Sequence, residues 1–109
     1  MKIRKELLKG STAIMILKII SKGDAYGYQI IQELFNGSTE VFKLNEGTLY
    51  PILHTMEKEG VIKSYSKISE QGRLRKYYSI TALGKVTLVA QVEEWKIFSS
   101  AVNSILKEV

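Results

Sequence analysis

The chain contains no cysteine, one proline and one histidine among its 109 residues. Without cysteine, neither a disulfide framework nor a thiolate metal site can form, and a single histidine excludes a histidine-rich metal cluster. Long apolar runs are also missing, since the longest, residues 13–17, is far shorter than the ~20 residues that cross a bilayer. We therefore expect a protein that holds no metal ion or cofactor and does not enter a membrane.

The first 20 residues begin with basic side chains and continue with apolar ones, as a signal peptide does. However, Lys18 interrupts the apolar stretch and no small-x-small cleavage site follows it. The length suits one hydrophobic core and is too short for two. The 45% hydrophobic and 25% charged residues are typical of a globular domain. We expect a cytoplasmic protein.

The positive charge is concentrated in two segments. Residues 1–10 carry a net charge of +3 and residues 61–80 carry +4, while the remaining segments together carry −2. Such clustering is typical of a surface that binds a polyanion. A basic surface that is merely solvated is an equally acceptable interpretation of the charge alone.

Helical periodicity predicts three helices in the first 60 residues. The first is expected from about residue 4 to residue 21, and the second from its N-cap, Asp24, to about residue 35. Gly27 in the second helix suggests a close approach by a neighbouring element, because glycine is otherwise unfavourable there. Residues 36–39, NGST, predict a turn, and a short extended segment is expected before the third helix in residues 46–60.

The apolar period changes from 3.6 to 2 after Gly60. Residues 61–68 and 73–80 are two β-like runs joined by a short loop, which predicts a hairpin. Thr81 is the expected N-cap of a final helix that reaches almost to Val109 and is roughly 40 Å long.

This element order is that of a winged helix-turn-helix with a C-terminal extension. We predict a mainly α fold with a small β-hairpin, in which residues 1–80 form a winged helix-turn-helix DNA-binding domain. Residues 81–109 form a long C-terminal dimerisation helix that packs with the N-terminal helix, so that the whole is one compact unit. The third helix would enter the major groove of DNA, and the hairpin, or wing, would lie along the backbone or in the minor groove.

The only proline, Pro51, lies inside the third predicted helix, where an interior proline costs roughly 3 kcal/mol. If Asn45 is the N-cap, Pro51 lies about six positions inside the helix. If Thr48 is the N-cap, Pro51 lies at the third position, where no intrahelical hydrogen bond is lost. An irregular first turn permitted by Gly47 is a third alternative. The sequence leaves all three open.

The third helix has one apolar side, on which Leu49, Leu53 and Met56 are expected to face the core. Its opposite side carries mostly small or hydrogen-bonding residues, which can approach base edges closely, while the helix N-terminus favours phosphate. A solvent-exposed face without a DNA role is the alternative. The predicted DNA-binding residues of this helix are Gly47, Thr48, Tyr50, Pro51, His54 and Lys58.

The wing carries basic residues that can meet phosphates. Strand alternation places Arg73, Arg75 and Tyr77 on one face of its second strand. A hairpin that uses charge to resist aggregation is the alternative interpretation. The predicted DNA-binding residues of the wing are Lys67, Arg73, Arg75, Lys76 and Tyr77.

Three segments follow one another along the chain: AYGYQIIQELF, LNEGTLYPILHTMEKEGVI and GRLRKYYSITALGK, with Trp95 after them. This series resembles the PadR family of bacterial transcriptional regulators, and within it the short subfamily that includes multidrug-sensing repressors. The resemblance extends over about residues 5–106. One departure is the triplet His54-Thr55-Met56, where the family more often has an arginine before the hydrophobic residue. That departure weakens the case for an arginine-like base contact at Thr55.

The resemblance implies a homodimer whose last helix forms the interface. It implies double-stranded, near-palindromic promoter DNA as the partner, repression of genes, and release by small effectors. In the multidrug-sensing members, a tryptophan that matches Trp95 stacks on flat aromatic drugs in a pore at the dimer centre.

The final helix itself predicts a dimer, because it carries an apolar stripe that three short helices cannot cover. Its exposed part is expected to pair with a second copy and with the first helix. The stripe ends at Val109. The predicted dimer-interface residues are Leu88, Val92, Trp95, Phe98, Val102, Ile105 and Leu106.

Trp95 has two interpretations. It can fill core volume at the interface, or the two indoles of a dimer can sandwich a planar aromatic effector, a cation included. Glu93 and Glu94 would favour a cation, although both can point to water. The sequence leaves the existence of an effector open.

The leading hypothesis is a homodimeric, sequence-specific DNA-binding transcriptional regulator, a repressor that a small effector releases at the dimer interface. The alternative is a winged-helix protein-interaction module without operator binding, since a fold alone does not assign function. An enzyme is not expected, because the sequence has no nucleophile elbow, phosphate-binding loop or metal-ligand cluster.

Overall fold

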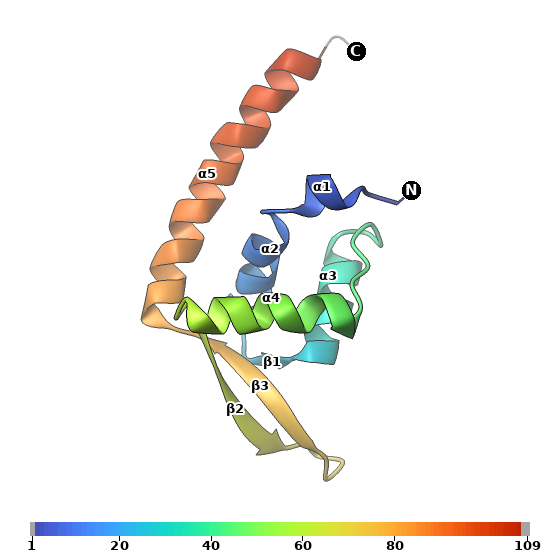
Figure 1. The fold of residues 1–109 in the computed structure, drawn as a ribbon, viewed down its shortest axis with the longest axis vertical. Coiled ribbons are helices and arrows are strands. Elements are labelled where there is room, and N and C mark those ends of the chain that lie inside the picture. Colours follow the sequence, from blue (N-terminus) through green and yellow to red (C-terminus); the bar gives the residue numbers. More distant parts are fainter. Residues whose placement is uncertain (1, 108–109) are drawn as a thin grey trace.

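The computed structural model of the protein describes residues 2–107. Figure 1 shows α2, α3 and α4 gathered into a body, from which the β2–β3 hairpin projects at one end and α5 at the other. The predicted mainly helical winged helix-turn-helix with a long C-terminal helix is confirmed. The elements are α1 (Lys5–Leu8), α2 (Thr12–Ser21), β1 (Ala25–Tyr26), α3 (Gly27–Gly37), α4 (Glu46–Lys58), β2 (Ile62–Ile68), β3 (Leu74–Ile80) and α5 (Ala82–Leu106).

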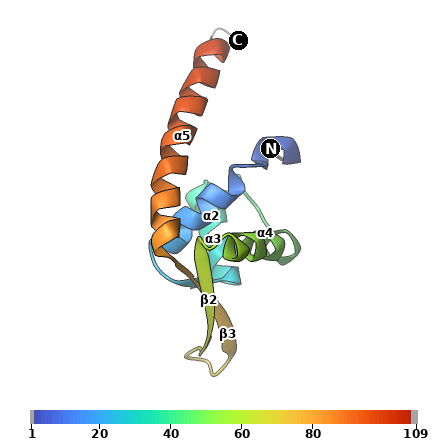
Figure 2. The same cartoon turned by 60° about the vertical axis from the view of Figure 1, so that its left-hand side comes forward.

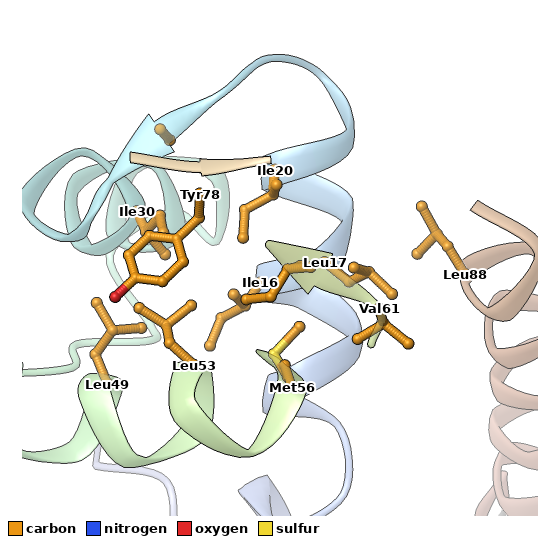
Figure 3. Packing of buried hydrophobic residues seen from close by; sticks show 12 residues of the cluster. Ile16, Leu17, Ile20, Ile30, Leu49, Leu53, Met56, Val61, Tyr78 and Leu88 are labelled. Atoms are coloured by element: carbon orange, nitrogen blue, oxygen red, sulfur yellow. The ribbon is translucent and has the colours of Figure 1, made fainter. Parts of the chain in front are cut away.

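The core lies where α2, α3 and α4 meet the base of the sheet (Figure 3). The apolar side of α4 is buried there, as its spacing predicts. Three side chains of α2 and the ring of one tyrosine of β3 meet it in the same cluster. These central residues are Leu49, Leu53, Met56, Ile16, Leu17, Ile20 and Tyr78.

The N-terminal helix is broken, which corrects the expectation of one helix over residues 4–21. α1 ends at Leu8 and α2 begins at Thr12, because Gly10 takes the left-handed backbone conformation with φ +88°. The Leu8 carbonyl accepts hydrogen bonds from the hydroxyls of Ser11 and Thr12, each at 3.0 Å. These two side chains support the turn that the glycine makes.

The second helix begins at Gly27, and Asp24 does not cap it, contrary to expectation. Instead, β1 pairs antiparallel with β3, so the sheet has three strands in the order β1-β3-β2 and is more than the predicted hairpin. The last residue of β1, Tyr26, precedes α3, and its amide donates a hydrogen bond to Gln29 Oε1 at 3.1 Å. The start of α3 is therefore set by strand pairing.

The connection from α3 to α4 also differs from expectation. Asn36 and Gly37 belong to α3, and the turn lies at residues 38–40, where Thr39 and Glu40 have positive φ angles of 55° and 67°. Residues 41–44, where an extended segment is expected, are neither helix nor strand, and Glu40 belongs to the turn.

Asn45 is the N-cap of α4, which decides among the three alternatives for Pro51. Asn45 Oδ1 accepts a hydrogen bond from the Thr48 amide at 2.9 Å, and the helix begins at Glu46, so Pro51 is its sixth residue. A proline there leaves the carbonyl four residues earlier, that of Gly47, without its helical donor. Because Gly47 is exposed, water can bind this carbonyl and lower the cost.

Thr81 caps α5, as expected, and also ties its first turn to the end of α4. The Thr81 hydroxyl oxygen accepts a hydrogen bond from the Gly84 amide at 3.0 Å, and the hydroxyl donates one to the Gly60 carbonyl at 2.6 Å. The Thr81 amide donates to the Val61 carbonyl at 3.1 Å. Gly84 is buried so closely that a Cβ atom would overlap the Val61 carbonyl and the Ile80 side chain.

The C-terminal half of α5 extends beyond every other described element in both ribbon views (Figures 1 and 2). The molecule consequently measures 54 × 31 × 21 Å along its principal axes. Within residues 2–107, no helix is long and apolar enough to span a membrane.

Replacing Gly84 with alanine should destabilise the fold by about 1–3 kcal/mol, because the new methyl group would overlap the Val61 carbonyl. Helix propensity alone predicts the opposite, a gain of up to about 1 kcal/mol. Urea unfolding followed by far-UV circular dichroism measures the difference. Gly37→Ala is the matched control, since this helical glycine has open space at its Cβ position and should tolerate alanine. An equal response of the two variants would contradict the close packing at Gly84.

Candidate nucleic-acid interface

The side of α4 that points away from the core is exposed along its length. Its only long charged chain among the predicted contact residues is Lys58, so the helix backbone can come close to a partner. All six predicted residues are exposed, namely Gly47, Thr48, Tyr50, Pro51, His54 and Lys58.

The Tyr50 side chain lies across the start of α3. A Cβ atom on Gly27 would lie 2.5 Å from the Tyr50 hydroxyl oxygen and 3.0 Å from Cζ, so a glycine is needed to leave the ring its place. This is the close approach that Gly27 suggests, and a side chain of α4 makes it. The Tyr50 ring is still 42% exposed, so its outer edge is free to contact a partner.

One face of the sheet carries a stack of aromatic rings and cations. Tyr65 of β2 stacks on Tyr77 of β3 with ring centroids 5.8 Å apart, and Tyr77 meets Tyr26 edge-on at 5.5 Å. The Arg75 guanidinium carbon lies 4.2 Å from the centroid of the Tyr26 ring, and Lys67 Nζ lies 5.7 Å from that of Tyr77. Cation–π attraction therefore orients both basic groups on this face.

The opposite face of the wing turns toward α4. Glu57 of α4 accepts a hydrogen bond from the Ser64 hydroxyl at 2.5 Å, and its other carboxylate oxygen lies 4.0 Å from Lys76 Nζ. The Lys76 side chain is 55% exposed, so this ion pair is weak and leaves the ammonium group accessible. Burial, together with the nearby Tyr50 and Glu57, raises the pKa of Tyr78 above its usual value of 10.0.

Asp24 has a partner that sequence reasoning missed. The Tyr65 hydroxyl donates a hydrogen bond to Asp24 Oδ2 at 2.6 Å, and this bond raises the pKa of the Tyr65 phenol above 10.0. Asp24 therefore binds the wing instead of capping a helix. No local pattern could indicate this pair, because the two residues are 41 positions apart.

A groove of about 570 Å³ lies between the N-terminal end of α4, the start of α3 and β3. It brings Tyr50 of α4 together with three predicted basic residues, Arg73 directly before β3 and Arg75 and Lys76 on β3. Tyr26 and Tyr28 also line it and were missed by sequence reasoning, although two hydroxyl-bearing rings flanking Gly27 are a usable signal. The lining residues are Tyr26, Gly27, Tyr28, Glu46, Tyr50, Arg73, Leu74, Arg75 and Lys76.

The groove combines three basic side chains and three phenol hydroxyls with one carboxylate, that of Glu46. Guanidinium, ammonium and phenol groups all donate hydrogen bonds to phosphate oxygens. The other predicted contact residues lie outside this groove. They are Gly47, Thr48, Pro51, His54 and Lys58 on α4, and Lys67 and Tyr77 on the wing.

The predicted dimer interface divides into two parts. Leu88 is buried in the core of its own chain, and Val92 is half-buried beside that core, so this part of the stripe packs within the chain. Trp95 is 47% exposed, with its ring centroid 6.0 Å from that of Phe98. Val109 lies outside the described residues. The exposed predicted residues are Trp95, Phe98, Val102, Ile105 and Leu106.

Comparison with known proteins places these features in one family. Residues 16–90 match the sequence model of the transcriptional regulator PadR-like family. The chain is 30% identical over 84 residues to a transcriptional regulator of Mycobacterium tuberculosis, covering 77% of this chain and 75% of that protein.

Solved structures agree with that match. The structure of a transcriptional regulator from Clostridium thermocellum superposes with a TM-score of 0.83 at 32% identity, over 92% of this chain and 97% of the other. The crystal structure of a PadR-like transcriptional regulator from Bacillus cereus superposes with a TM-score of 0.82 at 36% identity, over 94% and 97%. Since the matched residues contain α4, the groove and the wing, the chain belongs to the PadR-like family of transcriptional regulators.

Proposed function

We propose that this protein is a homodimeric regulator that binds near-palindromic promoter DNA, with α4 in the major groove and the wing on the backbone. The observation that carries the proposal is the groove that Tyr50 of α4 lines together with Arg75 of β3 and Arg73 directly before that strand. A phosphate in this groove would contact the reading helix and the wing at once, and so fix the register of α4 against the bases. This role requires a cytoplasmic protein.

Within α4, the proposal assigns different roles to different residues. Tyr50 and His54 carry hydrogen-bonding groups suited to base edges in the major groove. Gly47 has no side chain and Pro51 has a compact ring, so both permit close approach of the helix. Lys58 in the last turn of α4 is positioned to contact a DNA phosphate. Its ammonium group would bind the phosphate as a point charge.

The partner that covers the exposed face of α5 is a second copy of the chain. The exposed apolar residues from Trp95 onward continue the stripe whose first member, Leu88, is buried, so the apolar surface runs from the core into solvent. Contiguous exposed apolar surface on a projecting helix is typical of an interface, and a two-fold pairs such a stripe with itself. The two α4 helices would then contact half-sites about 34 Å apart.

The proposed regulator is a repressor that a planar aromatic effector releases. This part of the proposal comes from the resemblance of the chain to multidrug-sensing members, together with the exposed Trp95–Phe98 pair on α5. An effector bound between two α5 helices would favour one separation of the reading helices over another and thereby shift the population away from the DNA-binding form.

The proposal is tested first by fluorescence anisotropy with a labelled duplex from just upstream of the protein's own gene. A scrambled duplex is the control, at two salt concentrations. A preference of about 10³-fold or more with a steep salt dependence is expected. Equal, weak binding to upstream and scrambled fragments alike would favour the protein-interaction alternative.

Arg75→Ala should weaken binding to specific and random duplexes alike, by about threefold to tenfold, because it removes a phosphate contact. The slope of log affinity against log salt should fall by up to about one phosphate contact. Lys96→Ala, which removes the same charge from an exposed position on α5, is the matched control and should change the slope less. An unchanged slope in Arg75→Ala would remove Arg75 from the contact surface.

His54→Ala should change which operator variants the protein prefers, because a mismatch at a base pair that the protein reads typically costs about 1–3 kcal/mol and that cost should fall when the reading imidazole is removed. Anisotropy titrations against single-base variants of the operator measure this. Arg75→Ala serves as the comparison, since losing a phosphate contact should scale all variants equally. Identical relative affinities in His54→Ala and the wild type would exclude base reading by His54.

Trp95→Ala should weaken binding of a planar aromatic cation such as proflavine by about tenfold while leaving the dimer intact, because it removes a stacking surface. Dye fluorescence measures binding and sedimentation velocity measures the dimer. Ile97→Ala, an exposed apolar residue two positions away on α5, is the matched control. Dissociation of Trp95→Ala into monomers would show that Trp95 fills the interface instead.

A further inference from the structure

Two consecutive residues of β2 join the wing to the rest of the chain from opposite faces of the sheet. The Ser64 hydroxyl donates to Glu57 of α4 at 2.5 Å, and the Tyr65 hydroxyl donates to Asp24, between α2 and β1, at 2.6 Å. Neighbouring residues of a strand point to opposite faces of a sheet, so one bond lies on each face. Within residues 2–107, these are the only side-chain hydrogen bonds that join β2 to residues outside the wing.

β2 is attached to the sheet on one side only, by its pairing with β3, so these bonds add a second attachment. β2 is the outer strand of the order β1-β3-β2, so its free edge has no backbone partner in the described chain. Beyond Ile62, the residues of β2 are half-buried or exposed, so burial in the core contributes little to holding them. Hydrogen bonds to carboxylates are stronger than neutral ones, and therefore hold an exposed strand better against water.

The Tyr65 bond acts on the basic face of the wing through the aromatic stack. The Tyr65 ring lies on Tyr77, Tyr77 meets Tyr26, and Tyr26 lies beneath the Arg75 guanidinium. Lys67 lies over Tyr77 in the same stack. A shift of Tyr65 would therefore displace the surfaces on which both basic groups rest.

We propose that the Tyr65–Asp24 and Ser64–Glu57 hydrogen bonds, here called the wing anchors, hold the wing at the angle to α4 at which the wing meets the DNA backbone. Their four members are positioning residues that need not touch DNA themselves. The inference rests on the DNA binding proposed above and adds how the wing is aligned for it.

The wing anchors predict an unexpected direction for the change in DNA affinity, because both hydrogen-bond acceptors are acidic residues beside the surface proposed to bind a polyanion. Removing a carboxylate there should strengthen DNA binding if charge alone mattered. Asp24→Ala should instead weaken binding to a random-sequence duplex by about threefold to tenfold, since it frees Tyr65. Glu33→Ala on α3 is the matched control, because it removes the same charge from an exposed residue that makes no hydrogen bond to the wing; it should bind equally or more tightly.

Tyr65→Phe tests the same anchor from its other end and keeps the ring of the stack. It should weaken DNA binding as much as Asp24→Ala does. Because both changes remove the same bond, the double variant should bind DNA as well as the single variant with the lower affinity. Both should lower the salt slope, since a misaligned wing makes fewer phosphate contacts. Ser64→Ala should act in the same direction through Glu57.

A spectroscopic readout checks the bond independently of DNA. The phenol titration of Tyr65, followed by ring carbon NMR, should move to lower pH in Asp24→Ala, because the hydrogen bond that raises its pKa is gone. A thermal melt of each variant confirms that it is folded. An unchanged Tyr65 titration in folded Asp24→Ala would overturn the anchor.

The outcomes separate this inference from the function on which it rests. If the wild type binds no duplex at low salt, the proposed function fails and the inference fails with it. If the wild type binds and Asp24→Ala binds as tightly as Glu33→Ala, the anchor alone is wrong. Weakening in Tyr65→Phe without weakening in Asp24→Ala would place the Tyr65 hydroxyl on DNA itself and would also overturn the anchor.

Discussion

The burial of one side of α4 sets the orientation on which the candidate interface depends. Leu49 and Leu53 are 0% exposed, and fully burying a leucine side chain contributes about 1.5–3 kcal/mol. Rotating α4 about its axis would expose them, so the helix has one stable orientation. Core packing therefore fixes the direction in which its outer face points. Tyr78 belongs to the same core, so the orientation of β3 relative to α4 is also fixed by packing. The groove between them therefore has a defined shape.

That constraint also shows how α4 tolerates Pro51. An interior proline costs roughly 3 kcal/mol in a helix that nothing else holds. Here the Asn45 cap and the buried leucines hold the helix on both sides of the proline, and the Gly47 carbonyl that loses its donor is exposed to water. The proline therefore lies on the exposed side of a helix that tertiary packing stabilises, and its compact ring leaves that side open to a close partner.

Sequence reasoning succeeded where a pattern repeats and failed where one residue or one distant pair decides. The apolar stripe of α4, the two wing strands and the cap at Thr81 follow from periodicity and local capping rules. The break at Gly10 depends on a single positive φ angle, and β1 has two residues and exists only because β3 pairs with it. The Tyr65–Asp24 bond is a tertiary contact with no local signature, so Asp24 was assigned to the nearest helix.

The junction of α5 with the body explains how a change at the proposed dimer interface could reach the proposed DNA surface. Val61 lies between the end of α4 and β2, and its carbonyl accepts the Thr81 amide while packing against Gly84. The first turn of α5 is thus joined directly to Val61, the residue that connects α4 to the wing. If an effector bound near Trp95 tilted α5, the rigid junction at Val61 would transmit the tilt. α4 and the wing would then move with α5. Packed elements of this kind switch between discrete arrangements, so the close contact at Gly84 is as necessary to the proposed regulation as it is to the stability of the fold.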